Sequence, residues 1–377
     1  MKKIYLHIGT HKTGTTALQF FLWNNRIRLK ELGFLYPTIG LGGGYSHGVL
    51  ANIIKPNNQD DRLTEYKNEF NREIGRSDAP NILLSSEVFL EGLNIASSVR
   101  QFVDQDAFDV IIIVYLRNQV DWLQSVFNEV IRDPYRRFTG DIFQLREYQQ
   151  QYHDYERILE PWVKHFGDDA IVVRPYGNFR YKNAIFHDFL NTVGIKDLDS
   201  FNYDVKNTNE NIRLHPLATE FLRRANRFAM MQDEYCMVVD ELSRISTILA
   251  DKYGKNYITI TPETKNEIVE KFEVRNRELF RRYAGLKDMS LFESMKRDGD
   301  SISSQSGFGA EVQHFIIDNM KTEVRQFLEM LVDSIKNRKE GKPFLRVPPV
   351  NNEDRLNEVI LRQRLELRKI YEILREK

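Results

Sequence analysis

Two glycines, one lysine and four threonines lie together near the start of the 377-residue chain, in the run Gly9-Thr10-His11-Lys12-Thr13-Gly14-Thr15-Thr16. An apolar stretch ends at Gly9 and a helical pattern begins after Gly14, which predicts a strand, a short loop and a helix. In such a loop the free backbone N–H groups and the helix N-terminus converge on one small anion site. These residues therefore predict phosphate binding.

The loop differs from the Walker loop, G-x-x-x-x-G-K-[ST], in the place of its lysine. Gly9 and Gly14 keep the Walker spacing, but Thr15 and Thr16 follow them, and Lys12 lies inside the loop. A lysine at this position can contact the bridging oxygen of a group held against the helix N-terminus. The alternatives for these residues alone are an ordinary Gly/Thr turn or another class of P-loop.

Two side chains further along the sequence are candidate general bases. The apolar run 82–84 is followed by two serines and Glu87, and ligands of open α/β sheets bind beyond the carboxyl ends of strands. The alternative for Glu87 is a helix-capping turn. His47 lies in the glycine-rich loop 40–48, which can present a base, although a lone loop histidine is more often simply solvated.

A second candidate anion site follows the apolar strand 110–116. Arg117 ends this strand and supplies a bidentate fork for phosphate, and Ser125 on the next helix supplies a further donor. Asn118 and Asp121 predict the N-cap of that helix. Ser125 falls on the polar face of the helical projection, opposite the apolar face, so we expect it to point away from the core.

The loop and the arginine motif resemble those of one enzyme family. Lys12 to Thr16 match, without a gap, the Lys-Thr-Gly-Thr-Thr core of the 5′-phosphosulfate loop in sulfotransferases that use PAPS, 3′-phosphoadenosine 5′-phosphosulfate. Arg117 at a strand end and Ser125 eight residues later resemble the 3′-phosphate motif of that family. The charged, helical region 207–292 is similar to the helical end of bacterial carbohydrate sulfotransferases. The Arg-Lys-Gly segment of the cytosolic enzymes has no clear counterpart.

The resemblance implies an α/β fold, with a parallel sheet of four or five strands, helices on both faces and a helical C-terminal extension. It implies transfer of a sulfuryl group from PAPS to a hydroxyl of a carbohydrate or glycolipid. Lys12 is then catalytic, with Glu87 the first and His47 the second choice of base. No metal is needed, because the loop and Lys12 supply positive charge. The expected cofactor-binding residues are His11, Lys12, Thr13, Gly14, Thr15, Thr16, Arg117, Ser125 and Tyr176, the last as an aromatic for adenine.

Two other functions stay open at this point. A small-molecule kinase with an altered P-loop would require Mg²⁺ and a Walker-type aspartate at a strand end, and no convincing aspartate follows the predicted strands. A non-catalytic nucleotide-binding adaptor would use its C-terminal helices to recruit a partner. The presence of both Lys12 and Glu87 argues against the adaptor.

Composition limits the classes of partner and the compartment. The chain has 54 basic and 54 acidic residues, so we expect no general attraction to nucleic acid or to an anionic membrane. Its single cysteine, Cys236, rules out an intrachain disulfide and a cysteine zinc cluster. No stretch has the length of a signal-peptide core or a membrane span. Golgi sulfotransferases have a membrane anchor, so the resemblance, with no such stretch here, implies a cytoplasmic, bacterial protein.

We expect three regions: a sulfotransferase-like domain over 1–295, a linker with an amphipathic helix over 296–345, and a C-terminal helix over 346–377. Another helix is predicted over 143–160, ended or kinked by the proline that follows. In the last region, apolar residues at heptad spacing begin at Leu356. This seam needs a partner, which is either a second copy of the chain in a homodimer or the amphipathic helix of the same chain.

Overall fold

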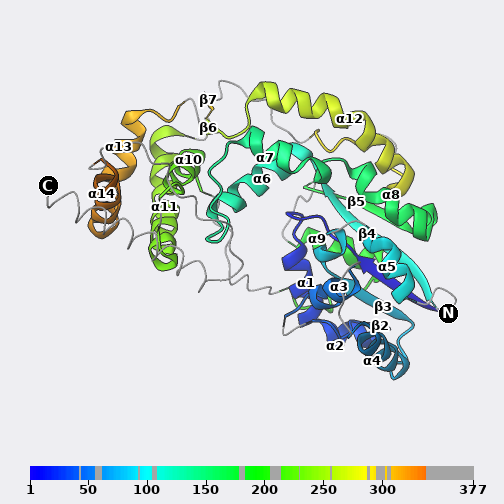
Figure 1. Ribbon diagram of the computed structural model, residues 1–377. Coiled ribbons are helices and arrows are strands. Elements are labelled where there is room, and N and C mark those ends of the chain that lie inside the picture. Colours follow the sequence, from blue (N-terminus) through cyan, green and yellow to red (C-terminus); the bar gives the residue numbers. More distant parts are fainter. Residues whose placement is uncertain are drawn as a thin grey trace. The chain divides into compact units, whose positions relative to one another are not determined.

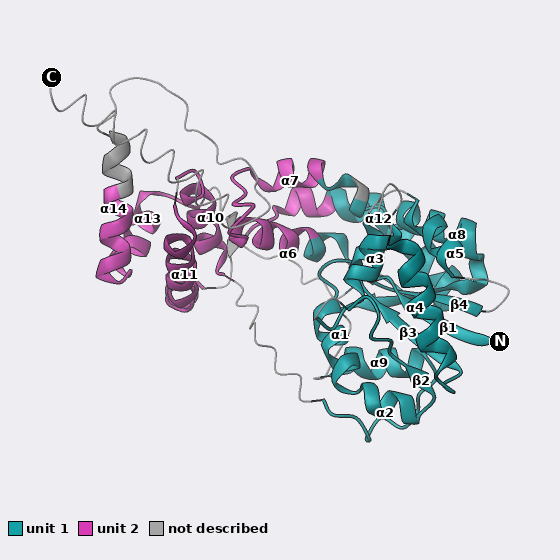
Figure 2. Ribbon diagram, turned by 60° about the horizontal axis from the view of Figure 1, so that its bottom comes forward, with its two compact units in different colours: residues 1–122, 149–210, 267–295 teal, residues 123–148, 211–266, 296–377 magenta. Residues whose placement is uncertain are grey.

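The computed structural model describes residues 1–41, 44–55, 62–91, 94–103, 108–177, 183–203, 214–228, 230–254, 257–286, 289–293, 302–303 and 307–336. The chain divides into two compact units that interleave along the sequence (Figure 2). The first contains residues 1–122, 149–210 and 267–295, and the second contains 123–148, 211–266 and 296–377. Among the described residues no helix has the length and apolar character to cross a membrane.

The first unit is built on a five-stranded sheet in which all neighbouring strands are parallel, in the order β2-β3-β1-β4-β5 (Figure 1). The five strands confirm the α/β fold with a parallel sheet of four or five strands. Their bounds are β1 Lys2–His7, β2 Phe34–Leu35, β3 Asn81–Ser85, β4 Phe108–Arg117 and β5 Ile171–Tyr176.

Alternate residues of the strands enter two separate apolar cores, one on each face of the sheet. In β4, Ile112 and Val114 belong to one core, and Ile113 and Tyr115 belong to the other. This is the period of two expected for a strand with both faces covered. The first core includes α3 (Gly48–Ile54), α4 (Leu63–Gly75), α5 (Ile95–Phe102) and α8 (Tyr155–Phe166), and the second includes α1 (Thr15–Asn24), α2 (Arg26–Glu31) and α9 (Ala184–Thr192).

The register of the strands brings their carboxyl ends to one edge of the sheet. His7 of β1 pairs with Ser85 of β3 and with Ile113 of β4. Arg117, at the end of β4, pairs with Tyr176 of β5. Residues that follow these strands therefore lie at the edge where ligands of open α/β sheets bind.

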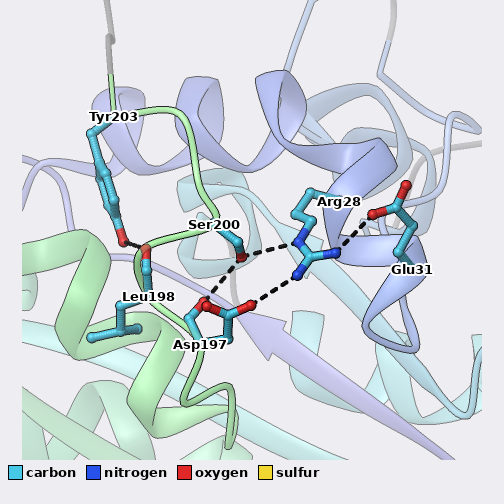
Figure 3. Close-up of polar contacts among 6 residues, drawn as sticks. All are labelled: Arg28, Glu31, Asp197, Leu198, Ser200 and Tyr203. Atoms are coloured by element: carbon cyan, nitrogen blue, oxygen red, sulfur yellow. Dashed lines mark hydrogen bonds and ion pairs between the residues drawn. The ribbon is translucent and has the colours of Figure 1, made fainter.

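The segment after α9 is tied to α2 by a polar network centred on Arg28 (Figure 3). Its guanidinium donates to Ser200 Oγ at 3.0 Å, to Asp197 Oδ2 at 2.8 Å and to Glu31 Oε2 at 2.9 Å. These groups are largely exposed, so each ion pair contributes little to stability. The network links the chain after α9 to α2, and none of its residues belongs to the site described below.

Helix α6 (Gln119–Arg132) begins as expected from its cap. Asn118 Oδ1 accepts a hydrogen bond from the Asp121 N–H at 2.8 Å, and Asn118 Nδ2 donates to Asp121 Oδ2 at 2.8 Å. The expected apolar face is buried, and Ser125 is half-buried. The division between the two units falls within this helix, and Ser125 belongs to the second unit.

The prediction of a single helix over 143–160 is wrong. The chain instead forms α7 (Ile142–Tyr148), a short 3₁₀ turn, and α8 (Tyr155–Phe166). Asp154 starts α8, because its side chain accepts a hydrogen bond from the Arg157 N–H. Pro161 lies inside α8 and does not end it. Tyr148, at the end of α7, is 79% exposed, whereas Tyr155 and Leu159 of α8 are buried.

The second unit is helical, with α10 (Pro216–Ala225), α11 (Gln232–Tyr253), α13 (Ala310–Asp318) and α14 (Thr322–Lys336), and α12 (Pro262–Ala284) extends into the first unit. The single amphipathic helix expected near 311–336 is divided between α13 and α14. Contacts from α11 explain the break: Arg244 donates to Asn319 O at 2.6 Å, and Glu241 Oε1 accepts from the Lys321 N–H at 2.7 Å. The expected C-terminal helix and its dimer seam lie outside the described residues.

Candidate functional site

Residues 8–14 between β1 and α1 form a tight loop with three left-handed backbone positions. The φ angles are 53° at Gly9, 67° at Lys12 and 72° at Gly14. Glycine adopts this region without a steric penalty, whereas a lysine there is uncommon and must be held by its surroundings. The two expected glycines are therefore explained, and Lys12 adds a strained backbone that the sequence pattern did not predict.

Two threonine side chains of the loop bond to backbone carbonyls inside the protein. Thr10 Oγ1 donates to Tyr115 O of β4 at 2.8 Å, and Thr13 Oγ1 donates to Thr10 O at 2.6 Å. Both threonines are buried, and so is Thr15, whereas Thr16 is exposed. Any contact from Thr13 to a ligand therefore comes from its backbone N–H, because its hydroxyl already donates within the loop.

The glycines permit close approach from two other strand ends. A Cβ on Gly9 would lie 2.7 Å from Thr15 Cγ2 and 3.5 Å from Glu87 Cβ. A Cβ on Gly14 would lie 3.1 Å from Tyr176 Cε2. The tertiary structure thus brings Glu87, after β3, and Tyr176, at the end of β5, against opposite ends of the loop.

Arg117 also contacts this loop. One of its terminal nitrogens donates to Lys12 O at 3.2 Å, and its guanidinium carbon lies 5.7 Å from the centre of the Tyr176 ring. The backbone of Arg117 is held by Tyr155, whose hydroxyl donates to Arg117 O. Two sequence motifs about a hundred residues apart are therefore adjacent in the first unit. Ser125, in the second unit, is not part of the site built here.

Glu87 begins a 3₁₀ turn, Glu87–Leu90, directly after β3. Ser86 Oγ accepts from the Val88 N–H at 3.2 Å, so a serine makes the capping contact considered for this turn. The half-buried Glu87 carboxylate instead accepts a hydrogen bond from Gln19 Nε2 of α1, at 2.8 Å to Oε2. The side chain of Glu87 therefore remains available for chemistry beside the loop.

His47 does not occupy the exposed loop position expected for a base. Its side chain is fully buried, Nε2 donates to Pro37 O at 3.0 Å, and Nδ1 accepts from the Ser85 N–H at 3.1 Å. Burial lowers the pKa of His47 to about 4. With both ring nitrogens bonded to backbone groups, His47 fastens the loop to β3, and we assign it a structural role.

His47 and His7 should make stability depend on pH. Burial lowers the pKa of His7 to about 3, and both pKa values lie below the unfolded value of 6.5. Because the unfolded chain then binds more protons, the free energy of unfolding falls as the pH drops from 6.5 toward 4. The slope approaches about 1.4 kcal/mol per pH unit for each histidine.

Urea unfolding at pH 7, 6 and 5 measures this slope. His47→Asn should lower the slope by up to about 1.4 kcal/mol per pH unit, the contribution of one histidine. The exposed His314 provides a matched control, because its replacement by asparagine leaves the buried His7 and His47 in place. An unchanged slope in His47→Asn would contradict the assignment.

Contacts among His11, Glu91 and Lys55 join the loop to the segment that follows Glu87. His11 Nε2 lies 3.5 Å from Glu91 Oε1, and Lys55 Nζ lies 2.9 Å from Glu91 Oε2. These contacts, that of His11 first, lower the pKa of Glu91 to about 2. The His11 ring is thus engaged by Glu91. The contribution expected of His11 to anion binding would therefore come from its backbone N–H.

Sequence reasoning missed Gln19 and Glu91 as members of this site. Gln19 lies one helical turn after Thr15, and Glu91 lies four residues after Glu87. Helical spacing from a motif residue is therefore the signal that could have identified Gln19. Glu91 has no comparable signal, because its partners His11 and Lys55 are distant in the sequence.

The site combines a loop that can attract an anion with Glu87, a carboxylate that no ion pair of the described residues engages, unlike Glu91. Backbone N–H groups of the loop and of the α1 N-terminus attract an anion, and Lys12 and Arg117 add positive charge. Glu87 can accept a proton from a hydroxyl. Within the described part of the chain, no group of three histidine, cysteine or acidic side chains could hold a metal ion.

Comparison with known proteins identifies one relative and no activity. No family model and no solved structure matches the chain. A protein of Archaeoglobus fulgidus, described as uncharacterized, is 28% identical over 255 residues, which are 66% of this chain and 66% of that protein. The chain thus spans slightly less than two thirds of its relative, and the likeness names neither substrate nor reaction.

Proposed function

We propose that the protein transfers a sulfuryl group from PAPS to a hydroxyl, with a carbohydrate or glycolipid as the acceptor class. The observation that supports this most is the convergence of three strand ends on the loop after β1. Glu87 packs on Gly9, Tyr176 packs on Gly14, and Arg117 donates to Lys12 O. This arrangement supplies positive charge, a candidate base and an aromatic side chain at one anion site.

The reaction is an in-line displacement at sulfur. The acceptor hydroxyl oxygen forms a bond to sulfur while the bond between sulfur and the oxygen of the 5′-phosphate breaks. The acceptor proton goes to the Glu87 carboxylate, and the electron pair of the broken bond stays on the phosphate of the leaving 3′,5′-bisphosphate, PAP. Phosphoryl transfer is the nearest template, since charge builds on the equatorial and leaving oxygens.

Each side chain has a distinct role in this proposal. Lys12 and the loop N–H groups stabilise the charge that develops on the leaving phosphate. Arg117 binds the 3′-phosphate, a role that the sequence motif also implies for Ser125, and Tyr176 offers a ring edge near the nucleotide. PAPS is a co-substrate, and the proposed reaction uses no metal.

Calorimetry with PAP, with ADP plus Mg²⁺ and with ATP plus Mg²⁺ tests the proposal. PAP should bind at least about 10-fold more tightly than ADP, because a charge-assisted hydrogen bond to the 3′-phosphate contributes roughly 1.5–3 kcal/mol. Tighter binding of ATP plus Mg²⁺ would support a kinase instead. Equal, metal-independent binding of all three without turnover of PAPS would support a nucleotide-binding adaptor.

Arg117→Ala and Ser125→Ala should weaken PAP binding selectively. We expect a loss of about 10- to 100-fold for the arginine and about 5-fold for the serine, because charged hydrogen bonds exceed neutral ones. Calorimetry with adenosine 5′-phosphosulfate, which lacks the 3′-phosphate, provides the control, and its affinity should change little. Equal losses for both ligands would show that these residues do not read the 3′-phosphate.

A further inference from the structure

We propose that Gln19 is a positioning residue that orients Glu87 toward the acceptor hydroxyl, an inference that rests on the proposed sulfuryl transfer. Gln19 Nε2 donates to Glu87 Oε2 at 2.8 Å. Because a carboxylate only accepts hydrogen bonds, this contact also fixes which end of the Gln19 amide faces Glu87. Glu87 is thereby linked to α1 as well as to its own strand.

The loop sets the distance between these two side chains. Thr15 and Gln19 are one turn apart on α1, so they share a face of the helix. Gly9 lacks a Cβ, which allows Thr15 and the backbone of Glu87 to approach it from two sides. The same close packing that shapes the anion site therefore places Gln19 beside Glu87.

Burial makes Gln19 a firm support. Its side chain is 2% exposed, whereas that of Glu87 is half-buried. A packed glutamine has already lost its rotamer freedom, so holding Glu87 costs little further entropy. Within the described residues, Glu87 Oε1 makes no hydrogen bond, and this oxygen is the one that would accept the acceptor proton.

Neighbouring groups make such a support useful. Burial raises the pKa of Tyr36, and the charge of Glu87 raises it further, so this phenol stays neutral beside the carboxylate. Tyr36 donates its hydroxyl to Tyr45 O and not to Glu87. Glu91, at the other end of the 3₁₀ turn, is paired with His11 and Lys55. The hydrogen bond from Gln19 is therefore the described contact that orients Glu87.

Release of PAP from PAPS, with a mixture of simple sugars as acceptors, tests this role in the full chain. Gln19→Met keeps the size of the side chain and removes its amide. We expect kcat to fall about 10-fold, the loss of one charge-assisted hydrogen bond, while KM for PAPS stays within 2-fold. In a Glu87→Gln background the same change should alter kcat by less than 2-fold, because the base that Gln19 orients is already absent.

Gln119→Met is the matched control, since Gln119 is equally buried but pairs with Asn276 and the His153 carbonyl. Its effect on kcat, whatever its size, should multiply with that of Glu87→Gln. Wild-type kcat in Gln19→Met, or a loss that multiplies with that of Glu87→Gln, would overturn the inference alone. Failure of the wild-type chain to bind PAP or release it from PAPS would instead overturn the proposed function, and the inference with it.

Discussion

Lys12→Ala is expected to lower the rate of PAP release from PAPS by about 10²- to 10³-fold, which is typical for the loss of one electrostatic contact to a transition state. Lys12 is half-buried in the loop, and its backbone carbonyl, which accepts from Arg117, is unchanged by the substitution. The fold should therefore lose little stability. Steady-state kinetics and a urea unfolding curve of the same sample measure both effects.

The left-handed backbone of Lys12 provides a sharper control than alanine alone. Glycine adopts a φ of 67° without strain, so Lys12→Gly should unfold at the same or a higher urea concentration than wild type. It should nevertheless lose activity as Lys12→Ala does, because both variants lack the ammonium group. Lys30→Ala, an exposed lysine of α2, should keep full activity. More than about a third of wild-type turnover in Lys12→Gly would refute the catalytic role.

Glu87→Gln is expected to lower PAP release by about 10²- to 10⁴-fold, the usual contribution of a general base. The substitution keeps the size of the side chain and allows a hydrogen bond with Gln19. The fold should therefore be unchanged, and the affinity for PAP should stay within 2-fold of wild type. Kinetics and calorimetry with PAP separate the two effects. A parallel loss of PAP affinity would mean that Glu87 shapes the anion site and does not remove a proton.

His47→Ala distinguishes the two candidate bases. Because His47 is fully buried and bonded at both nitrogens, this variant should unfold at lower urea concentration. Its activity per folded molecule should remain close to that of wild type. Full activity in Glu87→Gln, together with inactive but folded His47→Ala, would reverse the order of the two residues.

The sequence alone determined the strand framework of the first unit and the composition of its loop. Continuous apolar runs predicted β1, β3 and β4, since strands covered on both faces contain few polar residues. The spacing of Gly9 and Gly14 predicted the tight turn, and Asn118 with Asp121 predicted the start of α6. These signals are local, because propensity, capping and glycine geometry depend on a few neighbouring residues.

Helix boundaries were less predictable where distant residues decide them. The pattern over 311–336 is that of one amphipathic helix, but Arg244 and Glu241 of α11 bond to the backbone at its break. Likewise, Asp154 starts a new helix within the predicted span 143–160. Hydrophobic periodicity records which face is apolar, and it contains no information on competing caps and contacts from elsewhere in the chain.

Only the tertiary structure decided which polar side chains meet at the loop. The sequence offered His47 as a second choice of base because it lies among glycines, yet the fold buries it, with its ring bonded to the backbone of Pro37 and Ser85. The fold also brings Gln19 to Glu87, 68 residues away, and Arg117 to the Lys12 carbonyl, 105 residues away. The physical reason is that strand order brings the ends of β1, β3, β4 and β5 to one edge, and pairing across a parallel sheet is not encoded in any single segment.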